Sequence, residues 1–301
     1  MKKLFIIFVV ISSCGGSADN SVIDSSDTTT TTVADTTTTT VADTTISYKI
    51  ISDSYYEPFT RYVDIKELRI FVTQEVSKDF IKKVADTYVI MNKINPSIDS
   101  SLRNDYYSSL KNYYVFQRVG YIGPDYYTEK TGGSFDDALS PNPINGPYDE
   151  NVTDYIWEVP DASSNSQIGE VVEHLLHTIT NISFARAYPD WNWYDPSSKI
   201  RQATNEAIEK NIFDASSYQT FLNRGDEEGY HKITTQEFSF WFIATSWGYA
   251  DIYDLPGDEF SLSSKEQVKQ QLPIAYELYE EFIEKVLNPP TKNELNNIFN
   301  R

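Results

Sequence analysis

The sequence predicts an α+β fold in which helices dominate. Six segments repeat apolar residues at helical spacing, whereas only two short segments combine β-branched and aromatic residues as strands do. The segments do not alternate into two βα lobes, which argues against a solute-binding architecture. We therefore expect one helix-rich domain over residues 46–301, an ordinary to large size for a single domain.

The first half of this domain supplies both expected strands and two of the helices. Residues 68–73 have the composition of a strand, and Ser77 is placed to cap a helix that ends before Pro96. A second helix is expected over residues 98–111. A second strand is expected at residues 113–119, either at a sheet edge, where it would pair with an extended peptide, or in the sheet interior.

The second half is expected to be a loop followed by four helices. Residues 120–154 are rich in glycine, proline, aspartate and asparagine, a composition typical of loops. The helical spacing of apolar residues then predicts helices at residues 168–181, 200–211, 234–248 and 263–287.

The N-terminus has the residue order of a secretory signal. Lys2 and Lys3 precede an apolar run at residues 4–11, and small residues lead to Cys14. The apolar run is too short to cross a bilayer, which needs about 20 residues. The end of the segment resembles the bacterial lipobox, which implies that residues 1–13 are removed and that Cys14 is acylated. We therefore expect an exported lipoprotein, anchored to the membrane of the bacterial cell envelope.

A threonine-rich segment separates Cys14 from the expected domain. Residues 27–34 repeat as residues 35–42, and no aromatic residue occurs in residues 14–45. Such a segment buries too little apolar surface to offset the entropy of ordering it. Residues 14–45 are therefore expected to be the lipidated cysteine and a disordered tether, with a reach of roughly 30 Å.

The charge of the chain excludes some partners. The formal net charge is −19, and the expected loss of Lys2 and Lys3 makes it more negative. This excess argues against nucleic acid and against anionic lipid headgroups as partners. Cys14 is the only cysteine in the chain, so the domain must be stabilised by its core or by a metal ion rather than by disulfides.

One helical segment gathers potential metal ligands. The chain has three histidines, and two of them, His174 and His177, lie on one face of the helix expected at residues 168–181, beside Glu170 and Glu173. The opposite face is apolar. Glu173 and His177 lie one turn apart and can therefore bind a single ion from the same side. The same pattern also fits a solvated helix face, and the segment alone does not decide between the two.

A third ligand must come from elsewhere, and Glu237 is the best candidate. The helix expected at residues 234–248 is apolar almost all round, and a carboxylate buried there is costly unless it is paired or binds a metal. A competing interpretation is a capping box, in which Thr234 and Glu237 close the start of the helix. His231, just upstream, is expected to lie in an exposed loop.

These segments resemble a known family. The run Glu173-His-Leu-Leu-His177 has the outline of the zincin motif His-Glu-x-x-His with its first two residues exchanged. Tyr230 precedes Glu237 by seven residues, and Phe238 then opens an apolar stretch. Together they resemble the catalytic domain of anthrax toxin lethal factor, a zincin metallopeptidase, over roughly residues 60–288. The resemblance implies a zincin-like fold, peptide-bond hydrolysis, and a peptide or protein substrate.

The resemblance also implies roles for individual residues. Glu173, His177 and Glu237 take the places of the metal ligands, and Tyr230 that of the tyrosine that assists the reaction. The implied metal is zinc, or another divalent ion, because one nitrogen and two carboxylates form a harder site than two histidines do. His174 falls where the family has its general base, and its reference pKa near neutrality suits a proton acceptor.

The exchanged motif leaves three alternatives open. In one, His174 and His177 are the ligands and Glu173 or Glu170 is the base. In another, the protein is a metal-free relative of the family. In the third, the domain is a non-catalytic envelope module that binds a peptide or a partner protein.

Overall fold

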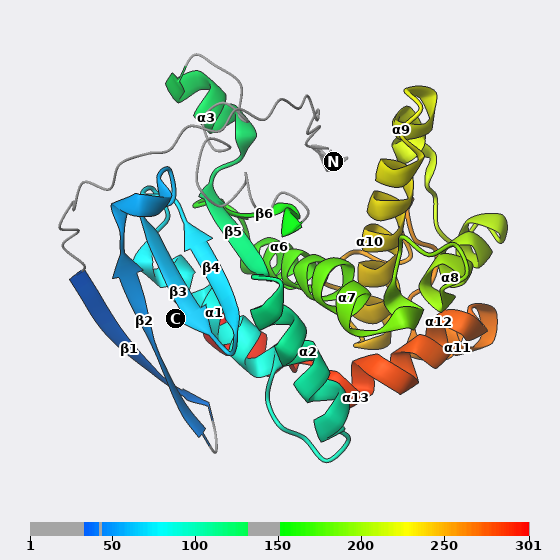
Figure 1. The fold of residues 1–301 in the computed structure, drawn as a ribbon, viewed down its shortest axis with the longest axis horizontal. Helices are drawn as coiled ribbons and strands as arrows, with labels where there is room; N and C mark the ends of the chain where they lie inside the picture. The colour runs from blue at the N-terminus through cyan, green and yellow to red at the C-terminus, as the bar shows by residue number, and fades with distance from the viewer. Residues whose placement is uncertain (1–32, 42–43, 132–150, 301) are drawn as a thin grey trace, which may run out of the picture.

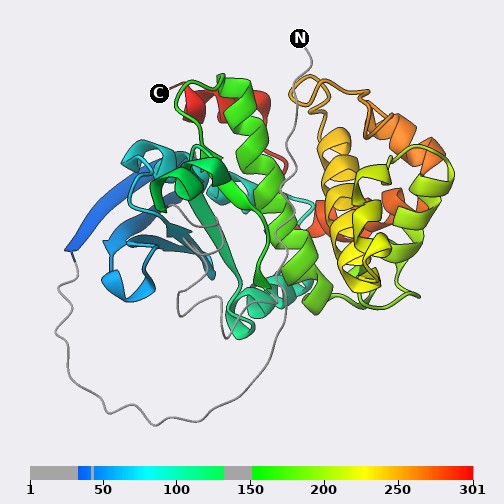
Figure 2. The same ribbon diagram turned by 90° about the horizontal axis from the view of Figure 1, so that it is seen from above.

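The computed structural model describes residues 33–41, 44–131 and 151–300. The expected signal, Cys14 and the first part of the expected tether lie outside the described residues. One sheet stands beside a group of helices, and α6 (Ser164–His177) runs between them (Figures 1 and 2). The architecture is mixed α and β with helix predominating, as the sequence predicts.

The sheet has the strand order β1-β2-β3-β4-β5-β6, so neighbours in the chain are also neighbours in the sheet. The strands are β1 (Val33–Val41), β2 (Thr44–Ser52), β3 (Arg61–Ile65), β4 (Leu68–Val72), β5 (Phe116–Tyr121) and β6 (Tyr155–Glu158). The first four strands pair antiparallel, whereas β5 and β6 add in parallel. The turn between β3 and β4 is formed by Lys66 and Glu67, both with positive φ, as the tightest hairpins require.

Each face of the sheet has its own core. Successive residues of β4 contribute to different cores, because successive side chains of a strand point to opposite faces of the sheet. Ile70 and Val72 join the main core together with residues of α1 (Lys78–Met91) and α6. Phe71 joins a smaller aromatic cluster on the other face.

Helices α1, α2 (Ser100–Asn112) and α3 (Pro124–Thr131) lie between strands of the sheet in sequence, and the helices from α6 onward form most of the second half. Besides α6 these later helices are α7 (Ala185–Ala187), α8 (Lys199–Glu209), α9 (Gln219–Asn223), α10 (Glu227–Ser246), α11 (Lys265–Gln271), α12 (Pro273–Leu278), α13 (Glu284–Val286) and α14 (Lys292–Phe299). Short 3₁₀ turns lie at η1 (Ser54–Tyr56), η4 (Pro189–Trp191) and η5 (Ser216–Tyr218). Two π-helical segments, η3 (Thr178–Phe184) and η6 (Tyr279–Ile283), continue α6 and α12.

Several predicted elements are confirmed by the structure. The strand at residues 68–73 is β4, and the capped helix is α1, whose N-cap Ser77 accepts a hydrogen bond from the Phe80 amide. The helices expected at residues 98–111 and 200–211 are α2 and α8. Their caps and apolar spacing are local signals, and local signals suffice to place such helices.

Other expectations about the elements are corrected or decided by the structure. The strand expected at residues 113–119 is β5, and of its two alternatives the interior one is confirmed, because β5 lies between β4 and β6. The expected loop at residues 120–154 contains α3, and β6 begins directly after it. The last predicted helix, residues 263–287, is divided by Leu272 and Pro273, because proline cannot donate a helical hydrogen bond.

The expected tether differs from the structure in its second half. Residues 33–41 form β1 and pair with β2 along their whole length. Threonine and valine are β-branched and favour strands, so a threonine-rich repeat can extend a sheet when a partner strand is adjacent. Among the helices of the described residues, none has the length and apolar character needed to cross a membrane.

Candidate metal centre

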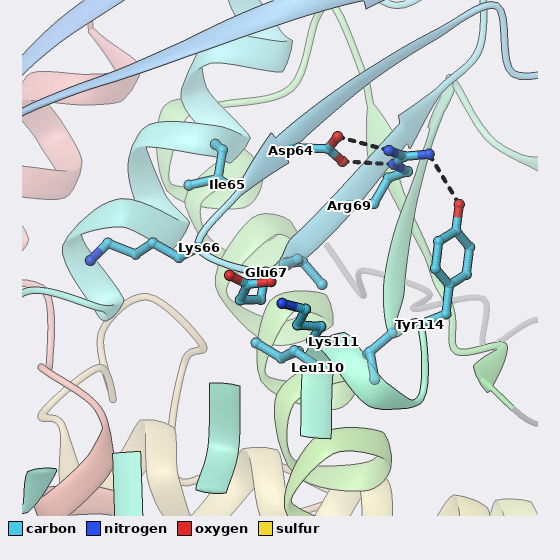
Figure 3. Close-up of a pocket in the computed structure, with 10 residues that line it drawn as sticks. Asp64, Ile65, Lys66, Glu67, Arg69, Leu110, Lys111 and Tyr114 are labelled. Carbon is cyan, nitrogen blue, oxygen red and sulfur yellow. Dashed lines mark hydrogen bonds and ion pairs between the residues drawn. The ribbon is translucent and has the colours of Figure 1, made fainter. Parts of the chain in front are cut away.

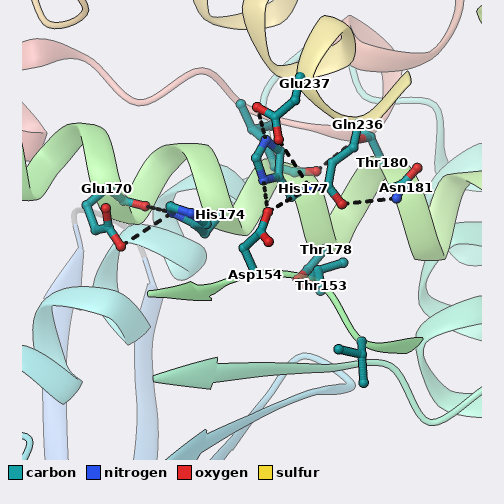
Figure 4. Close-up of polar contacts among 12 residues, drawn as sticks. Thr153, Asp154, Glu170, His174, His177, Thr178, Thr180, Asn181, Gln236 and Glu237 are labelled. Atoms are coloured by element: carbon teal, nitrogen blue, oxygen red, sulfur yellow. Dashed lines mark hydrogen bonds and ion pairs between the residues drawn. The ribbon is translucent and has the colours of Figure 1, made fainter. Parts of the chain in front are cut away.

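The end of α6 is the centre of the candidate site. The helix starts at the N-cap Ser163, and its apolar residues Val171, Val172 and Leu175 are fully buried. Its other face turns toward α10 and β6 rather than toward solvent (Figure 4). His177, the last residue of α6, has a side chain that is only 1% exposed. The interpretation of this stretch as a solvated helix face is therefore wrong at His177.

Helix α10 carries Glu237 into the interior. The helix begins at Glu227, with Asp226 as its N-cap, seven residues before the predicted start. Thr234 lies inside the helix, where its hydroxyl donates to the Tyr230 carbonyl at 2.7 Å. The capping-box interpretation of Thr234 and Glu237 is therefore wrong, and Glu237 is a buried carboxylate in the middle of a helix.

Glu173, His177 and Glu237 meet as the sequence predicts. Each offers one ligand atom, and the three atoms lie within 4.8 Å of one another. The Nε2 atom of His177 is 3.5 Å from Oε2 of Glu237 (Figure 4). This Nε2 is buried and has no hydrogen-bond partner among the described residues. An unpaired buried nitrogen that faces carboxylates fits the place of a metal ligand.

Asp154 completes the environment of His177 and was missed by the sequence analysis. Its Oδ2 is 3.2 Å from Nδ1 of His177, on the side of the ring opposite Nε2. Burial raises the pKa of Asp154, but the hydrogen bond and charge of His177 outweigh burial and lower it to about 2. Asp154 directly precedes β6. Because residues 120–154 were expected to form a loop and β6 was not expected, nothing in the sequence pointed to Asp154.

Gln236 connects the two carboxylates on either side of His177. Its amide nitrogen donates to Oδ2 of Asp154 at 2.7 Å and to Oε1 of Glu237 at 3.3 Å. Its carbonyl oxygen accepts from the amide of Asn181 at 3.1 Å. Asn181 lies in the π-helical segment η3, and π-helical turns frequently occur at functional sites. No sequence pattern singles out Gln236.

His174 belongs to a second set of ligand atoms. Its Nδ1–H donates to the Glu170 carbonyl at 2.7 Å. One atom each of Asp154, His174 and His177 lie within 4.8 Å of one another, so two candidate ligand sets share His177. Oε1 of Glu170 accepts the Trp157 amide of β6 at 2.8 Å and also lies 3.6 Å from Nδ1 of His174.

Arg118 acts on Asp154, but among the described residues no lysine or arginine is a main influence on the pKa of Glu173 or Glu237. Burial, together with the charges of Glu170, Glu259 and Asp154, raises the pKa of Glu173 to about 8, although His174 opposes the shift. Burial and the charge of Glu173 also raise the pKa of Glu237. A divalent ion would favour the ionised forms of these groups, since it supplies the missing positive charge.

The two histidines differ in their charge. Burial lowers the pKa of His177, so its ring is neutral at pH 7 and can donate a lone pair to a metal. Burial also acts to lower the pKa of His174, but the carboxylates of Glu170, Glu173 and Asp154 raise it to about 9. In the metal-free protein His174 is therefore protonated at pH 7, and it can accept a proton only when a cation offsets these carboxylates.

Tyr230 and His231 lie on α10 together with Glu237. Seven residues of helix separate Tyr230 from Glu237, which is about 10 Å along the axis. The Tyr230 hydroxyl accepts a hydrogen bond from Gln219 at 3.4 Å, and its catalytic role stays a prediction. His231, which was expected in an exposed loop, is instead a partly buried helical residue beside the Tyr230 ring.

Two cavities lie away from this site. One, of about 340 Å³, is formed by the turn between β3 and β4 and the end of α2 (Figure 3). Its polar side chains include Lys66, Arg69 and Lys111, and Arg69 is paired with Asp64 at 2.6 Å. The other, of about 490 Å³, lies beside Asp214. Neither is lined by a residue of the candidate site.

The outer edge of β6 is joined to α6. The Trp157 amide donates to Glu170, and the Trp157 carbonyl accepts from Gln167 at 3.1 Å. Strand addition by a peptide needs free backbone groups of this kind. At Trp157 these groups are already engaged.

The chain matches no known family, no curated protein and no solved structure.

Proposed function

We propose that this protein is a divalent-metal-dependent hydrolase of the peptidase type, with Glu173, His177 and Glu237 as the metal ligands. One observation carries the proposal. The Nε2 atom of His177 is buried without a hydrogen-bond partner among the described residues, and it faces the carboxylate of Glu237 at 3.5 Å. The resemblance of the two motifs to lethal factor, given above, supports the reaction class.

Asp154 supports the assignment of His177 as a ligand. Histidines that bind metals commonly donate their second ring N–H to a carboxylate, which fixes the tautomer and the ring orientation. Asp154 stands at 3.2 Å from Nδ1 of His177 and is itself held by Gln236. The ring is therefore set with Nε2 toward Glu173 and Glu237 before any ion binds.

Three protein ligands suit a catalytic site, because they leave a coordination position for water or substrate. A divalent ion bound there supplies a Lewis acid, which polarises a carbonyl group and makes its bound water more acidic. His174 would accept a proton once its pKa falls from about 9, as it does when a cation offsets Glu173. With one nitrogen and two carboxylates, the set suits manganese as well as zinc.

A non-catalytic metal-binding module is the second candidate, and burial favours it. The side chains of His177 and Glu237 are 1% and 9% exposed, and the two cavities described above lie elsewhere. In this alternative the ion stabilises the contact between α6 and α10, and a peptide or partner protein binds at another surface.

The location of the protein is proposed from the sequence alone. The lipobox-like segment supports export and acylation at Cys14, which would hold the domain at the membrane of the bacterial cell envelope. Metabolic labelling with a fatty acid tests this, because Cys14→Ser abolishes incorporation if the proposal is right.

Metal content and hydrolysis test the proposed function together. The chain from residue 15 onward, without a histidine tag, is dialysed against zinc or manganese and its metal is quantified by elemental mass spectrometry. We expect near-stoichiometric metal that is lost in His177→Ala and Glu237→Gln. The matched controls on α10 are His231→Ala and Glu228→Gln, the latter an exposed glutamate. A loaded protein that cleaves a peptide library supports the hydrolase, whereas a loaded but inert one supports the binding module.

A further inference from the structure

We propose that Asp154, His174 and Nδ1 of His177 form a second cation site, so that the His177 ring can bridge two divalent ions. The proposal rests on the metal site proposed above, because the first ion occupies Nε2 of the same ring. We call Glu173, Glu237 and Nε2 of His177 the inner set, and Asp154, His174 and Nδ1 of His177 the outer set. The outer set binds a second ion when metal is in excess of one equivalent.

The geometry provides donors on both sides of His177. On the inner side, Nε2 faces Glu237 at 3.5 Å, and Glu173 lies within 4.8 Å of both. On the outer side, Nδ1 faces Asp154 at 3.2 Å, and a ligand atom of His174 completes a second set within the same 4.8 Å limit. The rings of His174 and His177 stand nearly perpendicular, with centroids 5.4 Å apart (Figure 4).

The outer set differs from the inner one in its access to solvent. The side chains of Asp154 and His174 are 30% and 14% exposed, whereas that of Glu237 is 9% exposed. An ion can thus approach the outer set without opening the contact between α6 and α10. The outer set also offers imidazole and carboxylate donors, which suit zinc and copper.

Charge balance is compatible with two ions. The three carboxylates of Asp154, Glu173 and Glu237 carry three negative charges when ionised. Binding of the second ion replaces the Nδ1 proton of His177, which leaves to solvent, and the resulting imidazolate adds a fourth. Two divalent ions carry an equal positive charge.

The second ion has a consequence for activity. Asp154 turns from a hydrogen-bond acceptor of His177 into a metal ligand, and His174 becomes a ligand that can no longer accept a proton. Both changes remove groups that the proposed hydrolysis uses. The outer set is therefore an inhibitory site, and excess metal lowers activity.

The test is a copper and zinc titration of the chain from residue 15 onward, followed by equilibrium dialysis and electron paramagnetic resonance. We expect two zinc ions per chain at saturation. His174→Ala should retain the first ion and weaken the second by about 100-fold, since loss of outer-shell partners alone costs 10–100-fold. Asp154→Asn is the second variant, and His231→Ala is the control that keeps both ions.

Copper reports the bridge itself. One equivalent of Cu²⁺ should give a full paramagnetic signal, and a second should reduce the signal per ion, because an imidazolate couples the two spins. If the protein saturates at one ion and Glu237→Gln abolishes its binding, the second site is overturned and the proposed function stays intact. If a single ion binds, and its binding is lost in His174→Ala but kept in Glu237→Gln, both proposals are overturned. Two ions with uncoupled spins would overturn the bridge.

Discussion

Replacing Asp154 with asparagine isolates the support that the structure gives to His177. The substitution keeps the shape of the side chain and removes its charge. Oδ2 of Asp154 faces Nδ1 of His177 at 3.2 Å and accepts from Gln236 at 2.7 Å. Both donors reach the same oxygen, so the oxygen of an asparagine in that place can still accept from both, and what is lost is the negative charge of the acceptor.

The size of the effect follows from that loss. A hydrogen bond to a charged group contributes about 1.5–3 kcal/mol, and loss of an outer-shell carboxylate typically weakens metal binding 10–100-fold, or about 1.4–2.7 kcal/mol. We therefore expect the dissociation constant of the first ion to rise 10–100-fold. The metal-free fold should also lose stability, because burial opposes the ionised form of Asp154 but His177, His174 and Arg118 favour it and lower its pKa to about 2.

The assay is competition for the first equivalent of zinc against a chromophoric chelator at pH 7. Circular dichroism and urea unfolding of the metal-free protein check that the fold is retained. Asp161→Asn, at an exposed aspartate before α6, is the matched control. An unchanged zinc affinity in a folded Asp154→Asn variant would refute the role of Asp154 in orienting His177.

Three further predictions concern pH, capping and the core. The pKa of Glu173 is raised to about 8 in the metal-free protein, so Glu173 must lose a proton to bind metal. The affinity for the metal should therefore rise with pH from about 6 to 8. Calorimetry in buffers of different ionisation enthalpy should show a release of protons on binding, and Glu173→Gln should reduce it. Because Asp226, not Thr234, caps α10, Asp226→Ala should lower the free energy of unfolding by about 1 kcal/mol. Thr234→Ala should lower it less, and the opposite order in urea unfolding would contradict the assigned start of α10. Leu175 is fully buried in α6, so Leu175→Ala should cost about 2–5 kcal/mol by the same measurement, whereas a cost below about 1 kcal/mol would contradict its packing.

The helices were largely predictable because their signals are local. Ser77 caps α1 and the apolar face of α6 is continuous, so the sequence alone places both. The start of α10 was missed because Thr234 with Glu237 imitates a cap. β6 was missed because it is short and follows a segment of loop-like composition, and β1 because its threonines depend on β2 as a partner.

The inner ligand set was predictable, whereas its surroundings were not. The spacing of Glu173 and His177 follows from one turn of helix, and the burial of Glu237 follows from the apolar residues around it. Asp154 and Gln236 come from separate elements, and only tertiary packing brings them to His177. His174 was expected to accept a proton because its reference pKa is near neutrality, but the surrounding carboxylates raise that pKa to about 9.

The central claim is that His177 binds a divalent ion through Nε2 together with Glu173 and Glu237. The most direct test is a crystal of the protein loaded with one equivalent of zinc, examined by anomalous scattering at the zinc absorption edge. We expect a single peak between Nε2 of His177 and the two carboxylates, with Asp154 still at Nδ1. A peak only between His174 and Asp154, or no peak at saturating zinc, would contradict it.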